Sequence, residues 1–284
     1  MNTKAGTSIL AVTLCLLMAG LSASYGQTLL LDYSFNQSTG TTATDSSASP
    51  ANGTLTGAGS TWQNTGLPGN FTSTSVYSNS GASGTYVTAG DVAKLDGLGD
   101  ITFTGWLNVN SAVITAFAED RVLSKRNLGS FFDLTFTDTG SGSKGLALGI
   151  YTGIGTGTVT KSNTMDMSNG WFFYAVTRNS TTGGISFYYG TTAGSLTSAG
   201  GGTGQTGAIA DNANAFMVGN VSSNTDRAPD ADFSDIRIYN SVLGFSAIQA
   251  IQTSAIPEPN VAGLLFLGGT GLWFFAARRR FLRA

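Results

Sequence analysis

The ionisable side chains of this 284-residue sequence limit the chemistry that it can perform. Histidine is absent, and the only cysteine, Cys15, lies in an apolar stretch near the N-terminus. Ser-His-Asp and Cys-His nucleophilic catalysis, disulfide frameworks and ordinary zinc sites therefore have no suitable residues in the rest of the chain. Carboxylate chemistry and ligand binding remain.

Aspartate supplies nearly all of the carboxylates. Residues 27–254 contain 14 Asp and one Glu (Glu119) against 9 basic residues, a net charge of −6. Nucleic acid is a poor partner for that balance, because its phosphates need a basic surface. Short carboxylates in turns suit the oxygen-ligand sites of calcium, although the preference for Asp over Glu also arises by drift.

The elements that must position these groups are predicted to be β-strands. Apolar and polar residues alternate with a period of two in six segments, which places one side of each segment on a core. Gly, Ser, Thr and Asn fill the intervals, and Thr182-Gly183-Gly184 predicts a hairpin over 171–189. The six segments are Leu29–Phe35, Ile101–Val109, Phe132–Phe136, Leu146–Ile150, Phe172–Val176 and Ile185–Tyr189.

Two packed antiparallel sheets are the simplest arrangement for strands that each have one apolar face. The 228 residues from Gln27 to Ser254 are enough for one such domain with a single core. Only Phe245–Thr253 has a helical pattern, and Gly200–Gly204 is predicted to be a loop. The predicted fold class is all-β.

Four strings in order resemble the laminin-G-like, concanavalin A-type jelly rolls of bacterial secreted proteins. The resemblance covers nearly all of 29–251 and implies a jelly-roll β-sandwich. The strings are Tyr33–Asn36 with Asp45–Ser47 and Asn52–Leu55; Ile101–Leu107 with Arg121–Lys125; Trp171–Thr177 with Gly184–Gly190; and Phe233–Asn240 with Ile248–Ile251.

Members of that family often hold a structural calcium ion near the junction of the sheets. The resemblance places its ligands at Asp45 and Asp235, although Ser234 stands where an acidic residue is common. Alternatively, Asp45 closes a turn and Asp235 pairs with Arg237 or stays solvated. A second acidic cluster comprises Asp226, Asp230 and Asp232, and a solvated loop explains it equally well.

Sugar binding needs aromatic faces that stack on pyranose rings and polar groups that recognise hydroxyls. Four aromatic residues outside the most apolar strands are candidates, although no residue pattern singles out the carbohydrate-binding set. They are Trp62, Tyr77, Tyr86 and Tyr151. Trp106 and Trp171 lie in strands and are predicted to belong to the core.

Hydrolysis of a glycosidic bond needs two carboxylates about 5–9 Å apart. The glucanase branch of the jelly-roll fold uses the strand motif Glu-x-Asp-x-x-Glu, which does not occur in this sequence. Glu119 and Glu258 are the only glutamates. A non-enzymatic role is expected, with a glycoside hydrolase built on paired aspartates as the third-ranked alternative.

The N-terminus has the pattern of a secretory signal peptide. Lys4 precedes an apolar stretch from Ile9 to Leu21, and small residues follow it. Cleavage after Gly26 is predicted, so that residues 1–26 are removed. Leu14 stands before Cys15 where a lipoprotein signal needs a small residue, so the cysteine is interpreted as a hydrophobic residue of the signal.

The C-terminus combines three features in a fixed order. Pro257-Glu258-Pro259 is followed by an uncharged run over 261–277, and then by Arg278, Arg279 and Arg280. The 17-residue run would span about 26 Å as a helix, which is at the short limit for crossing a membrane. The arginines predict a cytoplasmic C-terminus.

This order resembles the bacterial PEP-CTERM sorting signal over residues 255–284. The resemblance implies processing by an exosortase, a membrane-embedded enzyme. It also implies export through an inner-membrane intermediate to the surface or matrix of a Gram-negative-type bacterium, often one that produces exopolysaccharide. A plain C-terminal anchor is the alternative.

Together these features predict an exported surface or matrix protein associated with exopolysaccharide. The alternative is a lectin-like module that recognises a particular glycan. The same sandwich fold supports binding, scaffolding and hydrolysis, so the fold does not decide between the two.

Overall fold

The computed structural model describes residues 27–254 apart from 65–70, 72–73, 116–117, 128–129, 154–155, 169 and 193. The predicted signal peptide (1–26) and sorting tail (255–284) lie outside the described residues, so both stay predictions. None of the helices in the described part of the chain has the length and hydropathy of a membrane span.

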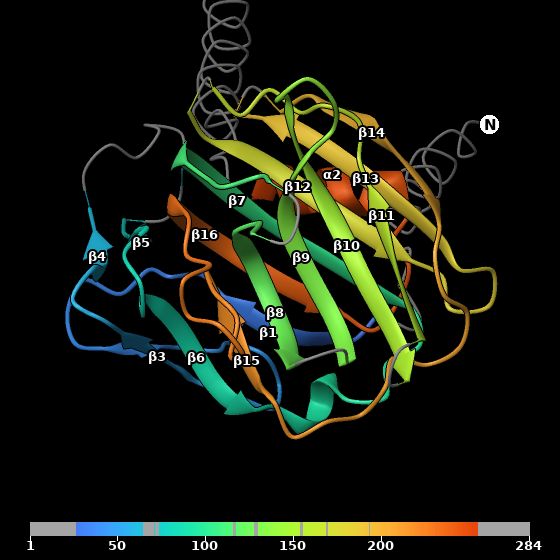
Figure 1. The fold of residues 1–284 in the computed structure, drawn as a ribbon. Helices are drawn as coiled ribbons and strands as arrows, with labels where there is room; N and C mark the ends of the chain where they lie inside the picture. Colours follow the sequence, from blue (N-terminus) through green and yellow to red (C-terminus); the bar gives the residue numbers. More distant parts are fainter. Residues whose placement is uncertain are drawn as a thin grey trace, which may run out of the picture.

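Two antiparallel sheets of eight strands each form the two layers of a sandwich (Figure 1). Sheet A has the order β14-β13-β12-β7-β16-β5-β4, with β1 also paired to β16. Its strands are β1 (Leu29–Tyr33), β4 (Ser60–Gln63), β5 (Val76–Ser80), β7 (Ile101–Ser111), β12 (Phe172–Arg178), β13 (Gly184–Thr191), β14 (Leu196–Thr203) and β16 (Asp230–Tyr239).

Sheet B has the order β11-β10-β9-β8-β15-β6-β3-β2 and lies in front of sheet A in the view of Figure 1. Its strands are β2 (Thr42–Ala43), β3 (Gly53–Thr56), β6 (Tyr86–Asp91), β8 (Arg121–Asn127), β9 (Ser130–Asp138), β10 (Lys144–Gly153), β11 (Thr156–Lys161) and β15 (Ala215–Val218). A 3₁₀ turn, η1 (Ala93–Leu95), precedes β7, and one helix, α2 (Phe245–Ser254), follows β16.

The core between the sheets consists of the apolar side chains that alternate along the strands. On β10, Leu146, Leu148 and Ile150 are fully buried, and they meet inward-facing residues of sheet A such as Phe103. Each fully buried side chain of this size contributes roughly 1.5–3 kcal/mol. The alternation in the sequence therefore predicted the core correctly, and the all-β prediction is confirmed.

A second apolar cluster lies on the outer face of sheet A, where α2 covers it (Figure 1). Ile248 of α2 packs with Trp106, Trp171 and Phe173. Trp106 is 0% exposed and Trp171 is 8% exposed, which confirms the prediction that both belong to the core.

The prediction of a loop over Gly200–Gly204 is wrong for most of its length. Gly200 to Thr203 belong to β14, and Gly201 pairs with Ser186 of β13. A Cβ atom on Gly201 would lie 2.1 Å from the carbonyl oxygen of Ile185, so the close approach of the two strands requires glycine there.

Candidate functional site

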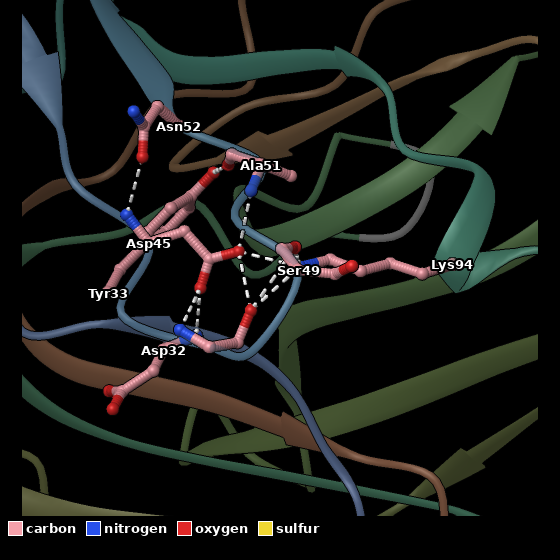
Figure 2. Close-up of polar contacts among 8 residues, drawn as sticks. Asp32, Tyr33, Asp45, Ser49, Ala51, Asn52 and Lys94 are labelled. Carbon is pink, nitrogen blue, oxygen red and sulfur yellow. Dashed lines mark hydrogen bonds and ion pairs between the residues drawn. The ribbon is translucent and has the colours of Figure 1, made fainter.

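Asp45 is the centre of a buried polar cluster at one end of the sandwich (Figure 2). Its Oδ1 accepts hydrogen bonds from the backbone N–H groups of Asp32 and Ser47, both at 2.9 Å. Its Oδ2 accepts one from the N–H of Ala51 at 2.8 Å, and the Nζ of Lys94 lies 2.6 Å from the same oxygen. The segment from Asp45 to Asn52 is therefore folded around a single carboxylate.

These contacts stabilise the ionised form of Asp45. Burial alone would raise the pKa of this carboxyl group, but the hydrogen bonds from Lys94 and from the backbone of Ala51, Ser47 and Asp32 outweigh burial and hold the pKa below its ordinary value. The carboxylate thus has a full set of donors and a cationic partner within the protein.

The geometry around Asp45 does not suit the predicted calcium ion. Calcium takes six to eight oxygen ligands, whereas the position next to Oδ2 is occupied by the ammonium of Lys94. A calcium ion on Asp45 would have to displace that ammonium. Within the described residues, no group of three or more Asp, Glu, His or Cys side chains is placed to hold a metal ion.

Asp235, the other predicted ligand, lies in a different environment. Tyr33 of β1 forms an isolated bridge with Asp45 on one side and pairs with Ile236 on the other. Asp45 and Asp235 therefore lie at opposite edges of β1. Asp235 occupies an irregularity in the pairing of β16 with β7, has a left-handed φ of 49° and lies 3.6 Å from Arg237. The alternative in which Asp235 pairs with Arg237 agrees with this contact.

Burial raises the pKa of Asp235 to about 6. The positive charge of Arg237 lowers the pKa, but the negative charge of Asp32 opposes that effect. In the second predicted acidic cluster, each aspartate accepts a hydrogen bond from a different side chain. The donors are Ser83 for Asp226, Asn110 for Asp230 and Asn108 for Asp232. Calcium binding by any of these residues stays a prediction, which titration of the protein with calcium can test.

Two further buried cations lie near Lys94, and the sequence analysis did not single them out. Lys125 is 0% exposed, and its Nζ lies 2.9 Å from Asp91 Oδ1 and 2.5 Å from Asp96 Oδ1, on either side of η1. Arg178, also 0% exposed, donates to the carbonyl oxygens of Gly99, Gln205 and Gly207. We refer to the part of the molecule around Lys94, Lys125 and Arg178 as the cation-held end.

The candidate stacking residues differ in exposure. Tyr77 is fully buried and stacks on Phe233 in the core, so the prediction that its ring is a candidate for stacking on a sugar is wrong. Trp62 and Tyr86 are half-buried, and the Nε1 of Trp62 donates to the carbonyl oxygen of Gly40. Tyr151 is half-buried on sheet B, with the guanidinium of Arg126 5.5 Å from the centre of its ring.

A groove of about 860 Å³ lies at the opposite end of β7 from η1. Three segments line it: the end of β7, the turn into β10, and the segment that leads from β11 to β12. Their lining residues are Val109 and Asn110; Ser143 and Lys144; and Thr164, Met165, Asp166, Met167 and Ser168.

The lining residues combine an apolar floor with polar side chains at the surface. Met165 and Met167 are 3% and 5% exposed and belong to the core between the sheets, so the floor is fixed by packing. Asn110 is exposed and Lys144 is half-exposed. Such a combination can hold a polar ligand through hydrogen bonds from side chains that stand on rigid elements.

No family model and no curated protein matches this sequence. Solved structures do match. The fold is a jelly-roll β-sandwich. The binding domain of Paraclostridial Mosquitocidal Protein 1 aligns with a TM-score of 0.61 and 13% identity, over 80% of this chain and 52% of that chain.

Domain 4 of AbnA, a GH43 extracellular arabinanase from Geobacillus stearothermophilus, aligns with a TM-score of 0.55 and 16% identity. It was solved in complex with arabinotriose, and the alignment covers 80% of this chain and 98% of that domain. A structure of botulinum neurotoxin type C, whose cell entry depends on interaction with two ganglioside molecules, aligns with a TM-score of 0.57 and 15% identity over 84% and 53% of the two chains. The chain spans about half the length of the two toxin structures.

Proposed function

We propose that residues 27–254 form a non-catalytic carbohydrate-binding module of an exported protein. The observation that carries this proposal is the fold, because the alignment spans nearly the whole of an arabinanase domain that was solved with arabinotriose. The same sandwich occurs in a neurotoxin that interacts with gangliosides. The fold alone does not identify a ligand, so the groove is the basis for a testable site.

The groove supports this proposal through its chemistry. The amide of Asn110 and the ammonium of Lys144 offer donors to sugar hydroxyl groups, and Ser168 offers a hydroxyl. Lys144 forms no ion pair with a described residue, whereas Lys94 and Lys125 are both paired. Its ammonium is therefore available to a ligand.

The first test is a glycan array with purified residues 27–254, in calcium and in a chelator. Saturable binding to a narrow set of glycans is expected. Replacement of Lys144 by Ala should weaken binding of the best glycan by roughly 10- to 100-fold, since one hydrogen bond to a charged group contributes roughly 1.5–3 kcal/mol. Lys161→Ala is the matched control, because Lys161 is exposed on the neighbouring strand and does not line the groove.

Isothermal titration of the array hit gives the two affinities. Binding to no glycan by a folded protein would contradict the carbohydrate-binding proposal. Wild-type affinity in the Lys144→Ala variant would instead place the site elsewhere, and the half-buried Tyr151 on sheet B is then the next residue to replace.

The proposal also covers the whole protein. We infer a surface or matrix component that is sorted by an exosortase and associates with exopolysaccharide, on the basis of the C-terminal motif and arginines. Replacing Pro257-Glu258-Pro259 by three alanines should retain the full-length chain in the inner membrane, which fractionation and immunoblotting can measure. Normal release of that variant would mean that the motif is not recognised.

A further inference from the structure

We propose that Lys94, Lys125 and Arg178 hold the loops at the cation-held end in place of a divalent metal ion. The folded domain would then need no calcium for its stability. The proposal concerns the architecture of the sandwich and does not depend on carbohydrate binding.

Lys94 makes a complete set of contacts for an ammonium group. Its Nζ donates to Asp45 Oδ2 at 2.6 Å, to Ser47 Oγ at 2.9 Å and to the carbonyl oxygen of Ser49 (Figure 2). An ammonium has three N–H donors, and all three have an oxygen acceptor here. Lys94 therefore joins η1 to the Asp45–Asn52 segment with no donor left over.

Lys125 repeats this arrangement in the interior. Its three acceptors are Asp91 Oδ1, Asp96 Oδ1 and, at 2.6 Å, the carbonyl oxygen of Asn212. The two aspartates flank η1, and Asn212 belongs to the segment between β14 and β15. One ammonium on β8 thus fixes both ends of η1 and a third segment of the chain.

Arg178 joins the next loops through carbonyl oxygens alone. Its Nη1 donates to Gly99 at 2.6 Å, and its Nη2 donates to Gln205 at 3.0 Å and Gly207 at 2.5 Å. Backbone carbonyls and carboxylates are also the ligands that calcium prefers. At this end of the sandwich, cationic side chains already occupy them.

A protein cation and calcium would compete for the same oxygens. Because each lysine is covalently attached to the sandwich, its local concentration is fixed and does not depend on the calcium in the medium. The expected consequence is a melting temperature that is the same in millimolar calcium, the range that fills weak extracellular calcium modules, and in EGTA.

The test uses the full chain, purified in detergent because of its apolar C-terminal run, and follows thermal unfolding by tryptophan fluorescence. Wild type should melt at one temperature in calcium and in EGTA. Lys94→Met, which keeps the aliphatic volume and removes the charge, should lower the melting temperature by about 5–10 °C, because Asp45 is left buried without its cation.

Lys161→Met is the matched control and should melt within about 1 °C of wild type, since Lys161 is exposed and, among the described residues, donates only to the carbonyl oxygen of Asp138. A double-mutant cycle with Asp45→Asn should be strongly non-additive if Lys94 acts through Asp45. The proposal would be overturned by a calcium-dependent rise in the wild-type melting temperature that Asp45→Asn abolishes. A Lys94→Met variant as stable as wild type would overturn it equally.

Discussion

The two ends of the sandwich use polar residues in opposite ways. At the cation-held end, Lys125 and Arg178 are fully buried, and they donate to carboxylate and backbone carbonyl oxygens of the chain. At the groove end, Asn110 and Ser168 are exposed, and the hydrogen bonds they make to Asp230 and Asp166 are open to water.

This difference separates structural from functional polar groups. A buried charge that loses its partner destabilises the fold by several kcal/mol, whereas an exposed pair contributes about 0–1 kcal/mol and can exchange its partner for a ligand. The same residue types therefore indicate stability at one end of β7, and at the other end they support the proposed binding site. Substitutions of matched lysines can test this contrast.

The largest effect is expected at Lys125. Replacement of Lys125 by Met should lower the free energy of unfolding by about 3 kcal/mol, because it removes the cation between Asp91 and Asp96 and leaves the carbonyl of Asn212 without a donor. Urea denaturation measures the change. Glycan affinity of the folded fraction should stay at the wild-type value.

Lys144→Met is the counterpart at the groove and should show the reverse pattern, with a stability within about 0.5 kcal/mol of wild type and weaker glycan binding. If both lysines affected stability equally, the two ends would not differ in the way described. If Lys125→Met weakened binding as much as Lys144→Met, the ends would be coupled.

The sequence predicted the strands because their pattern is local. The alternation in Phe132–Phe136 and Leu146–Ile150 appears in β9 and β10, and the pattern at Phe245–Thr253 appears in α2. A side chain on a half-buried strand has only two faces to choose from, so a few residues suffice to predict the core side.

The contacts of the cations could not be predicted in this way. Lys94 is 49 residues from Asp45 in the sequence, and Arg178 is 79 residues from Gly99. Such pairs depend on which loops the sheets bring to the same end, and neither Lys94 nor Arg178 stands in a motif. The groove is equally non-local, since it combines residues from Val109 to Ser168.

The structural role of the glycine run in β14 could not be predicted from the sequence either. A run such as Gly200-Gly201-Gly202 has the composition of a loop, but in β14 it allows close contact with β13. A glycine-rich composition permits either a loop or a strand that closely approaches its neighbour, and only the neighbouring strand determines which of the two forms. Aspartate is a second residue whose role depends on its neighbours.

Asp235 provides a second test of the comparison, because it is a buried aspartate whose cationic partner, Arg237, lies farther away, at 3.6 Å. Burial raises its pKa to about 6, whereas Asp45, with Lys94 at 2.6 Å, has a lowered pKa. Between its unfolded pKa of about 4 and its folded pKa of about 6, folded Asp235 binds more protons than the unfolded chain does. Its contribution to stability is therefore full below pH 4 and is lost as the pH rises through 6.

Asp235→Asn should remove that dependence. The expected gain in the free energy of unfolding is about 2–3 kcal/mol at pH 7.5, which follows from a rise of the pKa from about 4 to about 6 that already includes the attraction of Arg237, and close to zero at pH 4. Asparagine also tolerates the left-handed φ of 49° at this position. Urea denaturation at the two pH values measures both numbers. An asparagine variant that is less stable than wild type at pH 7.5 would show that the ionised Asp235 has a cationic partner as effective as Lys94, and the contrast between the two aspartates would fail.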